Sequence, residues 1–149
     1  MTIHELHRRV KSLNQSIRHD VEGIVKKTSY EMTTLNQNQL FNYGIGSDGL
    51  KLAPYKNKYY AQEKNYMNRR PGLGIPDLRL SGQYYNGMNV IVENYTYKIT
   101  SSDSKADKLE RMYPKAMGLT TPSMKSYAHG VFFIELRTLI TSKTGLKFA

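Results

Sequence analysis

Lysine, arginine and tyrosine are interleaved between Tyr55 and Arg70, in the stretch YKNKYYAQEKNYMNRR. Unpaired bases stack on aromatic rings and cationic side chains neutralise phosphates, so this composition is typical of single-stranded nucleic-acid binding. A second interpretation is that the tyrosines pack under a short helix or against a sheet, while the cations keep the surface soluble. A third is that the segment joins one protein to another. The candidate contact residues are Tyr55, Lys56, Lys58, Tyr59, Tyr60, Lys64, Tyr66, Arg69 and Arg70.

The four histidines do not form a recognisable metal site. His4 and His7 would share one face of a helix, but a zinc site needs a third or fourth ligand at comparable reach. The chain has no cysteine, which excludes disulfides, thiolate zinc sites and a cysteine nucleophile. We therefore expect no bound metal.

The glycine-rich loop at 44–49, GIGSDG, shares only its glycines with phosphate-binding loops. It lacks the Gly-Lys-Ser/Thr ending that holds a nucleotide, and no apolar strand precedes it. The carboxylates are few and scattered, and no serine or threonine stands with a histidine in a nucleophile motif. These patterns predict a protein that is not an enzyme, has no catalytic residues and needs no cofactor.

Length and charge restrict the classes of protein to which the chain can belong. Its 149 residues fit a single domain, 1–149. The formal net charge is +10, and residues 51–79 hold seven basic residues against Glu63 and Asp77, so half of the excess lies there. Such a field attracts polyanions, either nucleic acid or an acidic protein surface. No apolar run is long enough to span a bilayer, so we expect a cytosolic protein without membrane contacts.

Apolar residues recur every three or four positions over residues 3–35, which predicts a long N-terminal helix. Thr2 is a suitable N-cap because Glu5 follows three residues later. A narrow apolar stripe of about 30 residues is longer than a small core can cover. We therefore expect part of this helix to pack on a neighbouring subunit. The expected seam residues are Val10, Leu13 and Ile17.

Two loops rich in turn residues, 42–49 and 70–76, bracket the basic segment and predict an extended arm at 50–76. Alternating apolar residues on both sides of residues 93–94 predict a β-hairpin. A short helix should end near Pro114, and a final helix should begin with Thr121 as its N-cap and end at Gly145. The sequence GVFFIEL inside that last segment also fits a buried strand.

The stretch LRLSGQYYNG precedes the expected hairpin. We expect Leu78 and Leu80 to point into the core and Gly82 to permit a turn or a close approach of two backbones. Together, the patterns predict an α+β fold with a long N-terminal helix, a small antiparallel sheet with a central hairpin, and a C-terminal helix.

Three short phrases follow one another between Asp48 and Ser102. They contain Leu52, Pro54 and Tyr55; then Leu78, Leu80, Ser81, Gly82, Tyr85 and Gly87; then, in the hairpin, Val90, Val92, Tyr97, Ile99 and Ser101. In this order and spacing, the chain resembles the tail-completion and head-to-tail joining proteins of tailed bacteriophages, a group that includes virion-morphogenesis minor tail proteins.

The resemblance implies a structural virion protein that forms a homo-oligomeric ring in the head-to-tail connector or neck and joins the portal or adaptor to the tail. Such a protein would be found in the virion, and in the host cytoplasm during assembly. The arm at 50–76 would then order on an acidic neighbouring ring, and DNA passing through would touch it without sequence preference. The alternative is a sequence-independent nucleic-acid-binding module that uses the same basic, tyrosine-rich segment.

Overall fold

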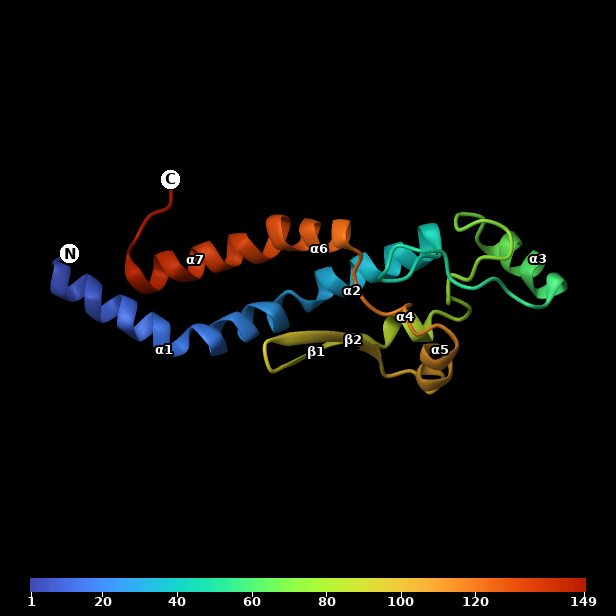
Figure 1. The fold of residues 1–149 in the computed structure, drawn as a ribbon, viewed down its shortest axis with the longest axis horizontal. Helices are drawn as coiled ribbons and strands as arrows, with labels where there is room; N and C mark the ends of the chain where they lie inside the picture. The colour runs from blue at the N-terminus through green and yellow to red at the C-terminus, as the bar shows by residue number, and fades with distance from the viewer.

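A computed structural model describes residues 1–149 and shows an elongated molecule of mixed helix and sheet (Figure 1). The strands are β1 (Met88–Glu93) and β2 (Thr96–Ser101). The helices are α1 (Ile3–Lys27), α2 (Ser29–Asn38), α3 (Lys58–Met67), α4 (Gln83–Asn86), α5 (Ala106–Met112), α6 (Thr121–Tyr127) and α7 (Phe133–Thr144), with π-helical turns at Gln39–Tyr43 and Ala128–Phe132.

The predicted N-terminal helix is confirmed, and it bends once. Helix α1 runs for 25 residues, and the Thr2 hydroxyl accepts a hydrogen bond from the backbone N–H of Glu5 at 3.1 Å, as expected for its N-cap. At Thr28 the backbone leaves the helical conformation, and the Thr28 hydroxyl donates to the carbonyl of Ile24 at 2.8 Å. Side chains that bond back to the preceding turn often bend helices, and Thr28 here separates α1 from α2.

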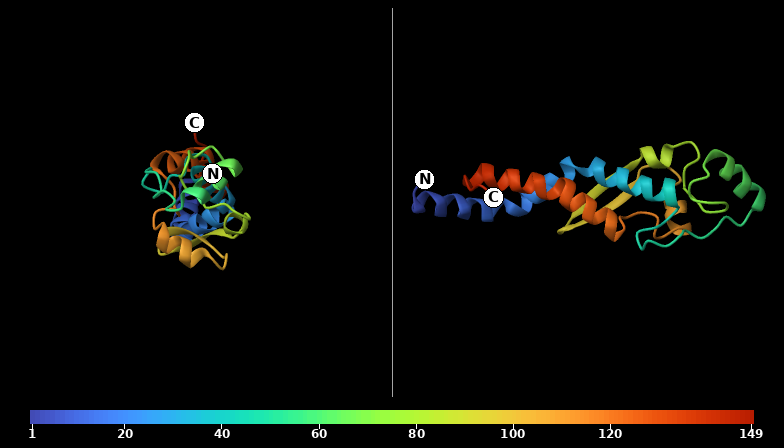
Figure 2. Two further views of the ribbon diagram at one scale, coloured as in Figure 1. Left: turned by 90° about the vertical axis from the view of Figure 1, so that its right-hand side faces the viewer. Right: turned by 90° about the horizontal axis from the view of Figure 1, so that it is seen from above.

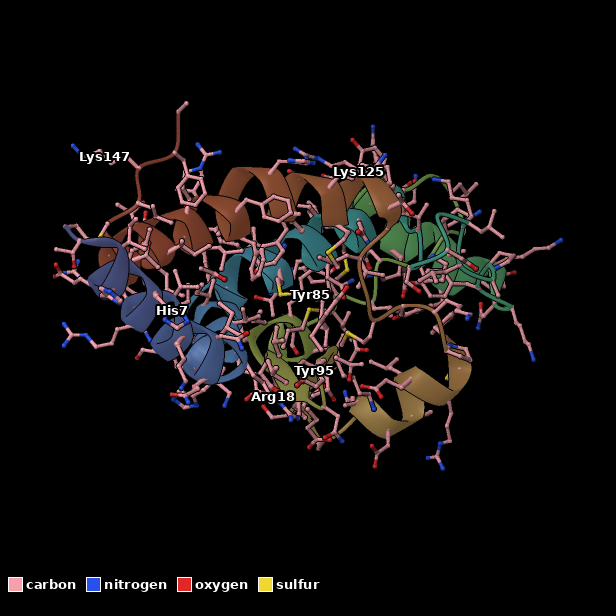
Figure 3. All side chains as sticks on the ribbon, turned by 60° about the vertical axis from the view of Figure 1, so that its left-hand side comes forward. His7, Arg18, Tyr85, Tyr95, Lys125 and Lys147 are labelled. Atoms are coloured by element: carbon pink, nitrogen blue, oxygen red, sulfur yellow. The ribbon has the colours of Figure 1, made fainter.

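The hairpin is also confirmed. Strands β1 and β2 pair antiparallel, with Val90 opposite Ile99, and form a two-stranded sheet. Asn94 and Tyr95 at its tip both have positive φ angles, of 48° and 63°, as the tight turns that match strand twist require. The ring of Tyr95 lies under the guanidinium of Arg18 on α1, 4.1 Å from the ring centroid (Figure 3). This contact joins the hairpin tip to the N-terminal helix.

The final segment is helical, as predicted, and not a buried strand. It consists of α6, a π-helical turn and α7, which ends where Gly145 adopts a positive φ of 77°. Its N-cap is Thr120 rather than the predicted Thr121, because the Thr120 hydroxyl accepts from the backbone N–H of Ser123 at 3.3 Å.

The buried core lies in one half of the molecule, which we call the head (residues 28–127). Two neighbouring apolar clusters fill it, one built around Leu40 and Tyr85 and the other around Met32 and Ile99. The other half, which we call the stalk, consists of α1 and α7 lying antiparallel side by side (Figures 1 and 2). In the stalk, only Ile24 of α1 and Thr144 of α7 are buried.

Two sequence-based expectations about the middle of the chain need correction. The segment 50–76 is not extended, since α3 occupies residues 58–67 and Leu52, Pro71 and Pro76 are buried. Leu78 is buried as expected, but Leu80 is exposed. The reason is local: the positive φ of Leu78, 56°, interrupts the alternation that would have turned both side chains the same way. Gly82 does permit a turn, with a φ of 89° just before α4.

Candidate functional site

Helix α3 carries much of the basic, tyrosine-rich segment and lies at the end of the molecule opposite the stalk (Figures 1 and 2). It begins at Asn57, whose side-chain oxygen accepts from the backbone N–H groups of Tyr59 and Tyr60 at 2.9 and 3.1 Å. Tyr59 and Tyr66 are seven residues apart and therefore share one helix face. They are 81% and 80% exposed, so both rings are free to contact a partner.

Lys64 lies on the buried side of α3 and is not available to a partner. Its side chain is 6% exposed, and its Nζ lies 2.8 Å from Oδ1 of Asp77 and donates to the carbonyl of Arg79. Asn68 and the backbone N–H of Arg79 also donate to the Asp77 carboxylate, at 3.0 and 3.1 Å. In the single chain, Lys64 is therefore engaged by Asp77 and Arg79, unlike the other predicted cations of this segment. Lys64 fixes α3 to the segment before α4.

Tyr55 and Tyr60 are not free stacking platforms either. Their rings meet edge to face, with centroids 5.0 Å apart and planes at 81°. Desolvation by burial raises the pKa of both hydroxyls, and the nearby Asp77 carboxylate raises them further. Each ring already has the other as an aromatic partner, and both are less exposed than Tyr59 and Tyr66.

The remaining predicted cations form no ion pairs within the chain. Lys56, Lys58, Arg69 and Arg70 are exposed, and none has a carboxylate within ion-pair distance. Arg70 is the most restrained of them, because its guanidinium donates to the side-chain oxygen of Asn42 at 2.6 Å. The segment that carries the exposed tyrosines of α3 therefore also carries exposed cations without an ion-pair partner.

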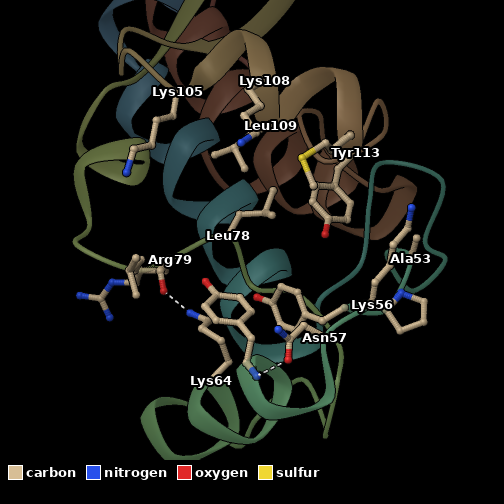
Figure 4. Close-up of a pocket in the computed structure, with 15 residues that line it drawn as sticks. Ala53, Lys56, Asn57, Lys64, Leu78, Arg79, Lys105, Lys108, Leu109 and Tyr113 are labelled. Carbon is tan, nitrogen blue, oxygen red and sulfur yellow. Dashed lines mark hydrogen bonds between the residues drawn. The ribbon is translucent and has the colours of Figure 1, made fainter.

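A groove of about 680 Å³ lies between α3 and α5, and we call it the α3–α5 groove (Figure 4). Its apolar surface includes Leu78, Leu109 and Tyr113, and its cations are Lys56, Lys64, Arg79, Lys105 and Lys108. The sequence pattern marked α5 only as a short helix. Lys105 and Lys108 could be connected with the tyrosine-rich segment only through the fold, because they lie about 40 residues further along the chain.

The lining of the α3–α5 groove determines its chemistry. None of its 15 lining residues is aspartate, glutamate, histidine, serine, threonine or cysteine. An acid–base pair of carboxylates or imidazoles therefore cannot be assembled from these side chains. Elsewhere in the chain, no three histidine, aspartate or glutamate residues lie close enough together to hold a metal ion. The arrangement of the groove is suited to binding an anion that also carries an apolar group.

The predicted seam residues lie in the stalk. Val10 is exposed, and Leu13 and Ile17 are half-buried. Helix α7 of the same chain covers part of α1. The sequence pattern predicted that part of this helix packs on a neighbouring subunit, and it did not indicate the contact with α7. Two ion pairs also join the helices: Lys143 lies 2.6 Å from Asp20, and Lys27 lies 2.8 Å from Glu135.

Apolar side chains remain uncovered on the other helix of the stalk. Phe133 and Ile134 of α7 are exposed, and Phe148 follows them just beyond the helix. These side chains line a second, smaller hollow, which His129 and Ile140 also line. Both helices of the stalk therefore present apolar surface to solvent.

None of the helices combines the length and the apolar character needed to cross a membrane. Comparisons with protein-family models, with curated proteins and with solved structures gave no match to this chain.

Proposed function

We propose that this protein is a structural subunit of a tailed-phage virion, which forms a ring in the head-to-tail connector or neck and joins the portal or adaptor to the tail. The resemblance of residues 48–102 to head-to-tail joining proteins supports the proposal from the sequence. The observation that carries it is the stalk, which has almost no core of its own.

The stalk is a single layer of two helices, α1 and α7, without a second layer to cover them. Helix α1 alone is 25 residues long and spans about 37 Å, yet only one of its residues is buried. Secondary-structure elements normally bury their apolar face against another element. Val10, Phe133 and Ile134 stay exposed instead. A second copy packed along the stalk would cover them, and repeated heterologous contacts of this kind generate a ring when the rotation between copies closes.

Helix α3 would form the joining surface at the opposite end. Tyrosines supply much of the contact area in protein interfaces, and Tyr59 and Tyr66 project together from α3. The net charge of +10 favours an acidic neighbouring ring and slows the approach of a basic one. DNA that passes through the ring would contact the same cations without sequence preference.

A second candidate function is a sequence-independent nucleic-acid-binding module. The observation in its favour is that Tyr59 and Tyr66 leave their ring faces open beside unpaired cations such as Lys58. Such a module would bind single-stranded DNA with an affinity that falls steeply with salt. A joining protein would bind free DNA only weakly at physiological salt and would assemble with itself or a partner.

Light scattering of the purified chain over a range of concentrations tests the proposal. The wild-type chain should form ring-sized assemblies, alone or beside portal, adaptor and tail proteins. Val10→Asp or Leu13→Asp should remove them, because a lone carboxylate in an apolar seam costs several kcal/mol. Asn14→Asp adds the same charge one position along α1, at an exposed residue, and should leave assembly intact. A wild-type chain that stays monomeric under all these conditions contradicts the proposal.

A further inference from the structure

We infer that the α3–α5 groove binds an acidic peptide segment of a neighbouring protein, held by carboxylates at the rim and by one apolar or aromatic side chain inside. The inference deepens the proposed function and rests on it only for the class of protein that supplies the segment, a neighbouring component of the virion. The binding itself follows from the charge, the apolar surface and the rigidity of the groove.

The charge of the groove calls for an anionic occupant. Besides the paired Lys64, its lining includes Lys56, Arg79, Lys105 and Lys108, all exposed and none in an ion pair. They come from three separate parts of the chain and line one hollow that has no carboxylate among its lining residues. The Arg79 guanidinium points away from the hollow (Figure 4) and lies over the Phe41 ring, 5.3 Å from its centroid. The lysines are therefore the cations nearest to an occupant. Like charges gathered in this way repel one another until a partner of opposite charge neutralises them.

The apolar surface of the groove favours a ligand that carries an apolar group as well as a negative charge. Leu78, Leu109 and Tyr113 lie within it, and Leu80 and Met112 at its edge are 61% and 55% exposed. An ion such as phosphate would leave this apolar surface in water. A hollow of about 680 Å³ accepts an aromatic or branched apolar side chain together with its flanking peptide.

The charge of the groove and the burial of its rings argue against two other occupants. A second copy of this chain has 22 basic residues against 12 acidic ones, so it offers few carboxylates that could neutralise a cationic groove. Single-stranded nucleic acid needs open ring faces, but in the groove Tyr113 is buried and Tyr55 is half-buried. The open rings, Tyr59 and Tyr66, are not among the lining residues. A peptide needs only apolar contact and carboxylates.

The groove is also held in shape before any partner arrives. The pair between Lys64 and Asp77 fixes α3 on one side, and the Asn57 cap fixes the first turn of that helix. On the other side, Tyr113 closes α5 with a backbone hydrogen bond to Leu109 at 2.8 Å. A site that is already ordered loses less conformational entropy on binding, so a short segment is sufficient.

Fluorescence anisotropy of the whole chain with a labelled peptide tests the inference. The probe is a short peptide in which glutamates flank a central Leu-Phe pair. Binding should be saturable, and a peptide with glutamines in place of the glutamates should bind at least about tenfold more weakly. A peptide with a Ser-Gly pair in place of Leu-Phe should lose affinity to a similar degree, because the apolar anchor is gone.

Charge reversal locates the site. Lys105→Glu combined with Lys108→Glu should weaken peptide binding about tenfold or more, and Met112→Asp at the exposed edge should also weaken it. Lys125→Glu combined with Lys147→Glu is the matched control, since it changes the net charge equally at exposed residues outside the groove (Figure 3). The control should bind the peptide within about twofold of wild type.

Three outcomes overturn the inference. The first is that the wild-type chain shows no saturable peptide binding. The second is that the groove variant and the control lose affinity equally. The third is that oligothymidylate displaces the peptide and that its own binding requires Lys105 and Lys108. The last result would assign the groove to nucleic acid. Light scattering of the same variants keeps the two proposals apart, because a groove variant that still assembles separates peptide binding from ring formation.

Discussion

The head and the stalk hold their helices together by different means. In the head, buried side-chain amides bind a loop from a distant part of the chain. In the stalk, two exposed ion pairs and a partly covered apolar stripe join α1 to α7. Exposed ion pairs contribute about 0 to 1 kcal/mol each to folding. The difference indicates that the head carries its own stability, whereas the packing of the stalk is incomplete in a single chain.

The amide contacts of the head involve α2 and the π-helical turn after it. The Asn36 side chain donates to the carbonyl of Ala116 at 2.9 Å and accepts from the backbone N–H of Gly118 at 2.9 Å. Gln39 donates to the carbonyl of Gly118 at 3.0 Å and accepts from the backbone N–H of Thr120 at 2.9 Å. These amides satisfy buried backbone groups that would otherwise destabilise the loop, and they fix its position.

The largest effect that would sharpen this comparison is expected at Lys64. Lys64→Met leaves the Asp77 carboxylate buried without its cation, which should lower the free energy of unfolding by about 3 to 5 kcal/mol in urea denaturation. Lys58→Met removes an exposed cation from the same helix and should change it by less than about 0.5 kcal/mol. Adding Asp77→Asn to Lys64→Met should restore much of the loss. Equal effects of the two lysine substitutions would mean that the buried pair does not hold α3.

A matched pair of leucines compares the two halves directly. Leu40 in the head is fully buried, so Leu40→Ala should cost about 2 to 5 kcal/mol of unfolding free energy. Leu13 in the stalk is half-buried, so Leu13→Ala should cost less than about 1.5 kcal/mol in the dilute, unassembled chain. The order should reverse in assembly measured by light scattering, where Leu13→Ala should be the more damaging. A stalk leucine that costs as much as Leu40 in the dilute chain would break the comparison.

High pH should destabilise the head and spare the stalk. Burial raises the pKa of Tyr84, Tyr85 and Tyr113 in the folded chain, while α1 and α7 contain no tyrosine. The unfolded chain releases these protons near pH 10, before the folded chain does. Their contribution to stability is therefore complete below about pH 10 and is lost as the pH rises toward the folded-state pKa values. Tyrosinate absorbance and thermal unfolding by circular dichroism should show the loss together.

Tyr84→Phe is the control for the alkaline transition and has the smallest expected effect. The buried Tyr84 hydroxyl has no hydrogen-bond partner, so its removal should leave stability at neutral pH unchanged or slightly higher. It should reduce the alkaline loss by removing one of the buried titrating groups. An unchanged alkaline transition in this variant would mean that other groups cause it.

The sequence predicts the elements whose causes are local. The helix period over residues 3–35, the Thr2 cap and the alternation around residues 93–94 depend on neighbours in the chain, and the structure has all three. The end of α7 is equally local. A helix often ends at a residue in the left-handed conformation, and the glycine at position 145 adopts it readily. Such features need no knowledge of what packs against them.

The candidate site could be predicted only in part, because its arrangement depends on distant contacts. In the sequence, nothing distinguishes Lys64 from Lys58. Only the fold places Asp77 next to Lys64. Lys105 at the N-cap of α5 and Lys108 within it line the groove because the fold places α5 beside α3, and the sequence pattern does not indicate this contact. Charge density marks the right region of the chain, but burial selects the residues within it.

Both ends of the chain lie at the far end of the stalk, while α3 lies at the opposite end of the long axis (Figure 1). The chain contains no cysteine, so a single introduced thiol gives one attachment point for a dye. His4→Cys would place a fluorophore on the stalk, where copies are proposed to meet, and Gln62→Cys would place one on the exposed face of α3. Energy transfer between dyes at residue 4 of neighbouring copies would report the contact between stalks. A solvent-sensitive dye at residue 62 would report the contact at α3 independently in the same particle.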